Sequence, residues 1–236
     1  VESGCEELRR QRDEALAEWH RQARELSEAR IATASTFSRE ITPRMQQLGM
    51  EGGRFEATVK PQDGSNPAQH GLDTVEFLVS ANPGQPLKPV ARVASGGELS
   101  RLSLAVQVAC VAEEPRCMVF DEVDAGIGGA TAEVVGRQLR SLGIKGQVLC
   151  VTHLAQVAAQ GHHQLKVTKT TTGGHTRTQL TRLSAKQRGP EIARMLGGAA
   201  VTSKALAHAQ EMLAAAAAQD QETARIQRPR ARTVQR

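Results

Sequence analysis

Aromatic side chains are scarce in this sequence of 236 residues, which contains four Phe, one Trp and no Tyr. A buried core must therefore be aliphatic, built from Ala, Leu, Val and Ile. The scarcity also argues against recognition of nucleic acid by stacking bases on aromatic side chains. Long apolar runs are missing as well: the longest uncharged stretch, around residues 102–112, is too short to span a bilayer, and no signal-peptide pattern opens the chain.

Cysteine is infrequent, and none of the four, at positions 5, 110, 117 and 150, forms a C-x-x-C pair. The last three lie in apolar stretches, so we expect buried, reduced thiols rather than disulfides or metal ligands. The formal net charge is +5, which permits a polyanionic partner but does not require one. The sequence begins with Val1 rather than Met, which suggests a piece of a longer or processed protein.

The first 48 residues have a helical pattern. Apolar residues recur from Cys5 to Ala29 in steps of three and four, with Arg12 and Gln22 interrupting the series. This weak heptad pattern is compatible with an arm of a coiled coil or with one long amphipathic helix on a globular body. A coiled coil would need a partner helix of comparable length, which this sequence does not supply. Pro43 is expected to break or restart the helix.

Strand patterns fall into two groups. Residues 55–59 and 75–79 alternate apolar and polar side chains, which predicts two β-strands. Residues 117–120 and 148–152 are continuous apolar runs, typical of parallel strands buried on both faces. A helical pattern at 134–142 lies between the latter two, and this order of elements predicts an α/β fold.

Towards the end of the chain, residues 165–169 and 177–183 flank a Gly-Gly pair, which predicts a β-hairpin. Beyond residue 219 the sequence is rich in Arg and poor in apolar residues. We therefore expect the last segment to be a basic, disordered tail.

The first of three motifs suited to chemistry is Ser95-Gly96-Gly97-Glu98, which precedes an apolar helical stripe. Ser95 and Glu98 fit a capping box at the start of a helix. Paired glycines at such a start also let backbone amides approach an anion such as a phosphate. The sequence alone leaves both interpretations open.

The other two motifs follow the two continuous apolar runs. Asp121 and Glu122 come directly after the first run, and His153 directly after the second. If the strands are parallel, these side chains leave the same edge of the sheet, where open α/β sheets bind ligands. One carboxylate there suits Mg²⁺ and its neighbour can orient a water molecule. The alternatives are an acidic cluster at the start of the next helix and a structural histidine.

Together these motifs resemble the C-terminal lobe of an ABC-type ATPase head. The matching segments are 95–101 (signature motif of the SMC-like branch), 119–122 (Walker B), 123–129 (D-loop), 151–158 (switch-histidine loop) and 191–198 (C-terminal helix). The last three are similar to the RecN family, SMC-like ATPases of bacterial DNA double-strand-break repair and recombination. The resemblance covers about residues 8–213.

The resemblance implies that Ser95, Gly96, Gly97, Glu98 and Asp124 bind ATP. Ser95 and Gly97 would contact the γ-phosphate of a nucleotide held by a second head, and Asp124 would cross the dimer interface.

The resemblance also implies the hydrolytic residues. Asp121 would support Mg²⁺, through water, and Glu122 would polarise the attacking water as a general base. His153 would contact the γ-phosphate. The implied cofactors are thus ATP and Mg²⁺.

One part of the family pattern is missing, because the sequence contains no G-x-x-x-x-G-K-[ST] phosphate loop and no Gly-Lys pair. In this family that loop belongs to the N-terminal lobe. We therefore expect a descending coiled-coil arm at 1–48, the C-terminal lobe of an ATPase head at 49–218, and the basic tail at 219–236. The chain would hydrolyse ATP only when joined to its N-terminal half and dimerised through ATP, and would be inactive alone.

The resemblance further implies non-specific binding of DNA, a cytoplasmic, nucleoid-associated location and no membrane partner. Two alternatives remain. One is a non-catalytic fragment that tethers DNA or acts as a scaffold. The other is a transporter nucleotide-binding domain, against which Glu98 and the arm-like N-terminal helix count.

Overall fold

The computed structural model describes residues 2–62, 67–92, 95–110, 117–172, 175–198 and 201–227. The chain divides into two compact units, Val1–Ala109 and Cys110–Arg236, and each is described by itself. Within the described ranges, no helix is both long and apolar enough to cross a lipid bilayer.

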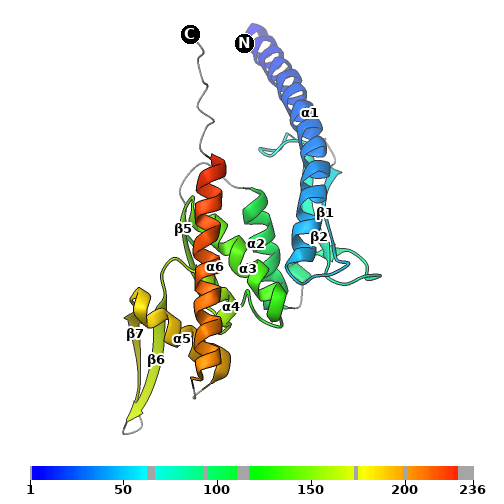
Figure 1. The fold of residues 1–236 in the computed structure, drawn as a ribbon. Coiled ribbons are helices and arrows are strands. Elements are labelled where there is room, and N and C mark those ends of the chain that lie inside the picture. Colours follow the sequence, from blue (N-terminus) through cyan, green and yellow to red (C-terminus); the bar gives the residue numbers. More distant parts are fainter. Residues whose placement is uncertain are drawn as a thin grey trace, which may run out of the picture. The chain divides into compact units, whose positions relative to one another are not determined.

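The first unit is built on a long helix, α1, which runs from Glu2 to Gln47 (Figure 1). Its C-terminal part is buried, and Ile41 and Met45 have no exposed surface. Its N-terminal part is polar and carries exposed ion pairs one helical turn apart, such as Arg21 with Glu25. The predicted long helix is confirmed.

The predicted break at Pro43 is wrong, because α1 continues through this residue. Proline removes the amide that would bond to the carbonyl four residues earlier. Packing on the adjacent strand offsets that loss: the Phe55 amide donates to Thr42 Oγ1 at 3.2 Å, and the Ala57 amide donates to Ser38 Oγ at 2.9 Å. These two hydroxyls serve the strand edge that no other strand covers in the described part of the sheet.

The remaining elements of the first unit are β1 (Arg54–Pro61), β2 (Asp73–Ser80), β3 (Lys88–Pro89), a short 3₁₀ helix (Val90–Arg92) and α2 (Gly96–Ala109). The strands pair antiparallel in the order β1-β2-β3, which confirms the two predicted strands. Three of the four Phe, at positions 37, 55 and 77, form a cluster with ring centroids 5.6–5.9 Å apart between α1 and the sheet.

The second unit contains β4 (Cys117–Phe120), α3 (Gly129–Gly143), β5 (Gln147–Cys150), α4 (Ala155–Gln160), β6 (Leu165–Thr172), β7 (His175–Arg182), α5 (Ala185–Gly197) and α6 (Ser203–Gln227). Strands β4 and β5 are parallel, and β6 and β7 form an antiparallel hairpin, both as predicted. Small residues let α4, α5 and α6 pack closely: Ala155, Ala159, Ala193 and Ala209 are buried together around Ile192.

The β4–β5 sheet is covered on one face only, so the prediction of burial on both faces is wrong. Phe120 is buried on one face, whereas Val119, Leu149 and Val151 are 69%, 43% and 62% exposed. Nothing in the described part of the chain covers this second, apolar face. The expectation of buried cysteines is also wrong: the thiols at 5, 110 and 117 are exposed, and only Cys150 is partly buried.

The predicted disordered tail begins too early. Helix α6 continues to Gln227, because no Gly or Pro lies between Gly198 and Pro229 in the sequence. Residues 228–236 lie outside the described ranges.

Candidate functional site

The parallel pairing of β4 and β5 brings two of the predicted motifs to one edge of the sheet. Phe120 is opposite Cys150 in the register, and the Val151 amide donates to the Phe120 carbonyl at 3.0 Å. Asp121 and Glu122 therefore leave β4 where His153 leaves the segment after β5. The structure thus brings these three residues together within the second unit, as their positions in the sequence predict.

Glu122 has an unusual backbone conformation directly after β4. Its φ of +57° lies in the left-handed region, and no other described non-glycine residue has a positive φ. The turn is closed by two hydrogen bonds, from the Glu122 amide to Asp121 Oδ1 at 2.9 Å and from the Ala125 amide to the Glu122 carbonyl at 3.0 Å. A left-handed conformation costs a residue with a side chain about 1–2 kcal/mol. Such strain gathers at functional sites, where it orients a side chain.

Asp124 connects the two loops at this edge. Its side chain is only 4% exposed, and one atom, Oδ2, receives two hydrogen bonds, from the Thr152 hydroxyl at 2.5 Å and from the His153 amide at 3.0 Å. The resemblance places this carboxylate across a dimer interface. In the structure it faces inward and binds groups of its own unit, so it holds the D-loop segment to the histidine loop.

Thr152 is a residue to which sequence reasoning assigned no role. Besides donating to Asp124, its hydroxyl accepts the Leu154 amide at 3.1 Å. The hydroxyl therefore links Leu154, which follows His153, to the carboxylate that accepts the His153 amide. The sequence offered one signal for Thr152, its position between an apolar strand and a histidine. Its partner Asp124 lies 28 positions away in the sequence.

His153 combines a fixed backbone with an accessible ring. Its side chain is 73% exposed, and Nδ1 lies 3.2 Å from Asp124 Oδ2. A neutral ring whose Nδ1–H faces a carboxylate presents Nε2 as an acceptor, and a protonated ring presents Nε2–H as a donor. Nε2 is the ring nitrogen left for a ligand.

The signature motif lies in the first unit, at the start of α2. The Glu98 amide donates to Ser95 Oγ at 3.4 Å, which is one half of the expected capping box. Gly97 is buried, and Gly96 and Ser95 are exposed. The capping interpretation is therefore supported for Ser95. It involves the Glu98 amide and does not involve the amides of Gly96 and Gly97.

The residues at the β4 end fit Mg²⁺ in one specific way. In the described ranges, no group of three or more His, Cys, Asp or Glu side chains could hold a metal ion. Mg²⁺ does not need such a group, because it retains water and is commonly held by one or two carboxylates together with substrate phosphates. Asp121 is an exposed carboxylate at a strand end and suits this mode of binding.

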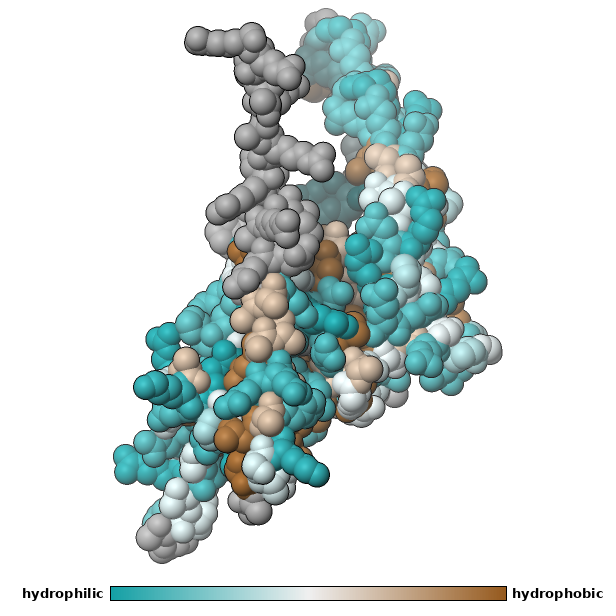
Figure 2. All heavy atoms as spheres, viewed as in Figure 1, coloured by the Kyte–Doolittle hydropathy of each residue, from teal (hydrophilic) through white to brown (hydrophobic). Residues whose placement is uncertain are grey.

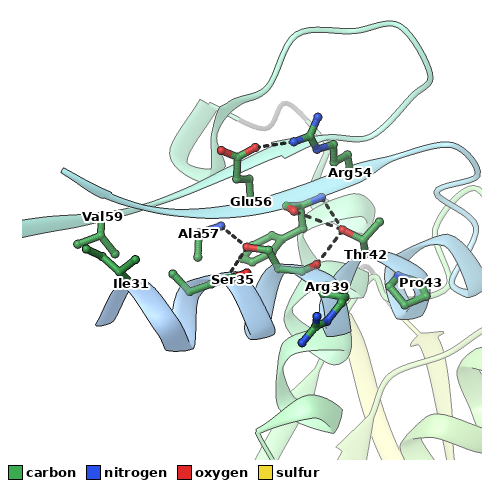
Figure 3. Close-up of a pocket in the computed structure, with 12 residues that line it drawn as sticks. Ile31, Ser35, Arg39, Thr42, Pro43, Arg54, Glu56, Ala57 and Val59 are labelled. Atoms are coloured by element: carbon green, nitrogen blue, oxygen red, sulfur yellow. Dashed lines mark hydrogen bonds and ion pairs between the residues drawn. The ribbon is translucent and has the colours of Figure 1, made fainter. Parts of the chain in front are cut away.

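A groove of about 640 Å³ in the first unit lies between α1 and β1 (Figure 3). Its lining includes apolar Ile31 and Val59 and charged Arg39 and Glu56. None of the predicted site residues lines it. Its polar groups include the hydroxyls of Ser38 and Thr42, which bond to the backbone of β1 and so hold the helix to the strand.

Cys150 is the least reactive thiol expected in the folded chain. Burial, together with the nearby carboxylates Asp124 and Asp121, raises its pKa to about 12. The thiolate is the reactive form, so at pH 8 we expect Cys150 to be alkylated at least about tenfold more slowly than the exposed Cys117. Mass spectrometry of iodoacetamide-treated peptides measures both rates. Urea should equalise them, and equal rates in the folded chain would contradict the burial described here.

No protein-family model matches the sequence. Over 195 residues, however, the chain is 51% identical to the DNA repair protein RecN of Vibrio cholerae, an alignment that covers 82% of this chain. The chain belongs to the RecN family. It is also 44% identical to RecN of Haemophilus influenzae over 209 residues and 39% identical to RecN of Streptomyces coelicolor over 219 residues, each alignment covering 88% of this chain.

The match to RecN is partial in length. The alignments span 35% of the Vibrio protein, 37% of the Haemophilus protein and 38% of the Streptomyces protein. The chain thus corresponds to a little over a third of its RecN relatives.

The fold is that of an SMC head domain. The crystal structure of the Smc head domain of Pyrococcus furiosus, with an extended coiled coil and bound to the C-terminal domain of ScpA, matches 82% of this chain and 46% of its own. The TM-score is 0.52 at 19% sequence identity. The predicted fold class is therefore confirmed.

Proposed function

We propose that this chain is the C-terminal part of an SMC-like ATPase that acts in DNA repair, and that it supplies the hydrolytic edge of an ATP site. The observation that carries the proposal is that Glu122 and His153 follow paired parallel strands at one sheet edge, where Asp124 accepts the His153 amide. Membership of the RecN family and the SMC head fold support it. In this setting the protein would act on chromosomal DNA in the cytoplasm.

The chemistry at this edge is phosphoryl transfer to water, which depends on positioning and on stabilisation of charge. Glu122 is the general base, because its exposed carboxylate leaves a strained turn beside the histidine loop. His153 contacts the γ-phosphate through Nε2. Asp121 would hold Mg²⁺, which would neutralise charge on the phosphates.

The signature motif completes the site of a second head. The exposed Ser95 and the glycines after it begin α2, where the amides of Gly96 and Gly97 and the helix dipole favour an anion. In a two-fold dimer, a motif on one copy can close over the nucleotide of the other copy. ATP would then join the two heads, and hydrolysis would release them.

Two surfaces of the chain fit the N-terminal half of the same head. The apolar face of β4–β5 is exposed at Val119, Leu149 and Val151, and the N-terminal part of α1 exposes Leu8 and Leu26. Exposed apolar side chains gathered on one face mark interaction sites. A further sheet layer would cover the first surface, and a second coiled-coil helix would cover the other. That half would also supply the phosphate loop.

This proposal predicts that the 236-residue chain alone has negligible ATPase activity, and that co-expression with the N-terminal portion of its own protein restores activity. The physical reason is that ATP lacks its main phosphate cradle without the loop. A coupled assay of phosphate release measures both preparations, with the N-terminal portion alone as a control. If the isolated chain hydrolysed ATP as fast as the co-expressed preparation, the N-terminal half would not be needed for hydrolysis and the proposal would be wrong.

A further inference from the structure

The second unit contains a long segment without acidic residues. From residue 134 to residue 190 there is no Asp or Glu, while nine Lys and Arg are present. The whole chain has 25 acidic residues against 30 basic ones, so this separation of charge is local. A surface of one sign attracts partners of the opposite sign. The β6–β7 hairpin lies within this segment.

The hairpin extends beyond the helices of its unit as a two-stranded ribbon (Figure 1). All residues of β7 are exposed. In the space-filling view, its outer part shows hydrophilic and intermediate residues up to the undescribed tip (Figure 2). Eight residues per strand give a ribbon about 26 Å long.

The base of the hairpin is anchored to α5, and its outer half is exposed. Lys166 forms a 2.7 Å ion pair with the buried Glu191 of α5, which also pairs with Arg194 at 2.6 Å. Farther out, Lys169 is opposite Thr178 and Arg177 is opposite Thr170 in the register. These two cations lie on opposite faces of the ribbon, because facing residues share a side and successive residues alternate.

Apolar and polar residues are separated along the ribbon. Leu165, Val167 and Leu180 are exposed, and all lie on one face of the anchored half. The outer half, 168–171 and 175–179, contains only Thr, Lys, His, Arg and Gln. Hydroxyl, amide and cationic side chains are the groups that bond to phosphate and sugar oxygens in nucleic-acid complexes.

We propose that the outer half of the β6–β7 hairpin binds the backbone of duplex DNA. No residue of β6 or β7 is acidic, so Lys169 and Arg177 favour a polyanion. A two-stranded β-ribbon also fits the major groove of B-form DNA. Contacts from Lys169, Arg177 and the threonines are independent of base sequence. The proposal concerns a different surface from the ATP site and does not depend on nucleotide hydrolysis.

The test measures binding of the full chain to a fluorescent DNA duplex by anisotropy, without nucleotide, over a range of salt concentrations. The variant K169Q/R177Q should bind roughly tenfold or more weakly at about 0.1 M salt, and its log–log salt dependence should be shallower by about two. The control variant K145Q/K204Q removes the same charge from exposed positions outside the hairpin. A second comparison, R230Q/R232Q, removes two of the four arginines in the last nine residues.

Each outcome decides the proposal. A loss confined to K169Q/R177Q, with circular dichroism unchanged, supports it. Equal losses of affinity in all three double variants would assign binding to the overall positive charge of the chain and would overturn the proposal. A loss of affinity only in R230Q/R232Q, or no binding by the unmodified chain, would also overturn it. L180T should leave DNA affinity unchanged; a loss as large as that of K169Q/R177Q would point to the apolar face instead. Because ATP is absent, the result is independent of the proposed hydrolysis.

Discussion

Replacing Glu122 with Gln is expected to lower ATP turnover by roughly 100- to 10,000-fold in the complete protein, the range typical of a lost general base. The amide keeps the size of the side chain but cannot accept the proton of the attacking water. ATP binding should be retained, because the change leaves the phosphate contacts in place. Single-turnover hydrolysis and equilibrium nucleotide binding, measured on the same preparation, separate the two effects.

A matched control for this variant is Glu133→Gln. Glu133 is exposed on α3 and pairs with Arg137 at 3.2 Å, and surface pairs of this kind contribute little. Its replacement should leave turnover within about a factor of two. If Glu122→Gln also left turnover at that level, Glu122 would not be the base.

The same variant separates an ATPase from a scaffold. Loss of repair of broken DNA in cells with DNA binding intact would favour the proposed ATPase. Full repair activity by the Glu122→Gln protein would instead favour a role in tethering DNA, for which hydrolysis is not needed.

Replacing Asp124 with Ala is expected to lower the free energy of unfolding of the second unit by about 2–4 kcal/mol. The change leaves the Thr152 hydroxyl and the His153 amide without their acceptor in a buried place, and such unsatisfied groups are costly. Urea unfolding followed by far-ultraviolet circular dichroism measures the effect. The single Trp, Trp19, lies in the first unit, so its fluorescence provides an internal reference.

Two Thr152 variants refine this result. Thr152→Val keeps the shape and removes the hydroxyl, and should cost about 1–2 kcal/mol, whereas Thr152→Ser keeps the hydroxyl and should cost less. If Asp124→Ala unfolded at the wild-type urea concentration, the carboxylate would not be holding the two loops together. A shift of the Trp19 transition by the same amount would show that the effect is not confined to the second unit.

Local patterns in the sequence were sufficient to predict most elements of the fold. The long N-terminal helix, the paired strands β1 and β2, the parallel strands β4 and β5 and the β6–β7 hairpin all follow from apolar periodicity and turn residues. Such patterns work because the type of each element and its apolar face depend on residues close in the sequence. The position of the acidic pair and the histidine followed as well, since parallel strands end at the same edge.

Other features depended on contacts between distant residues, and only the tertiary structure decided them. Pro43 stays inside α1 because a strand edge and a buried face hold the helix around it. The β4–β5 sheet is covered on one face because covering a face requires a second layer, which a strand pattern does not specify. Asp124 turns inward because Thr152, 28 residues away, offers it a hydroxyl. The sequence thus shows which types of side chain lie at the site. Their hydrogen-bond partners are decided by the tertiary structure, because those partners are far apart in the sequence.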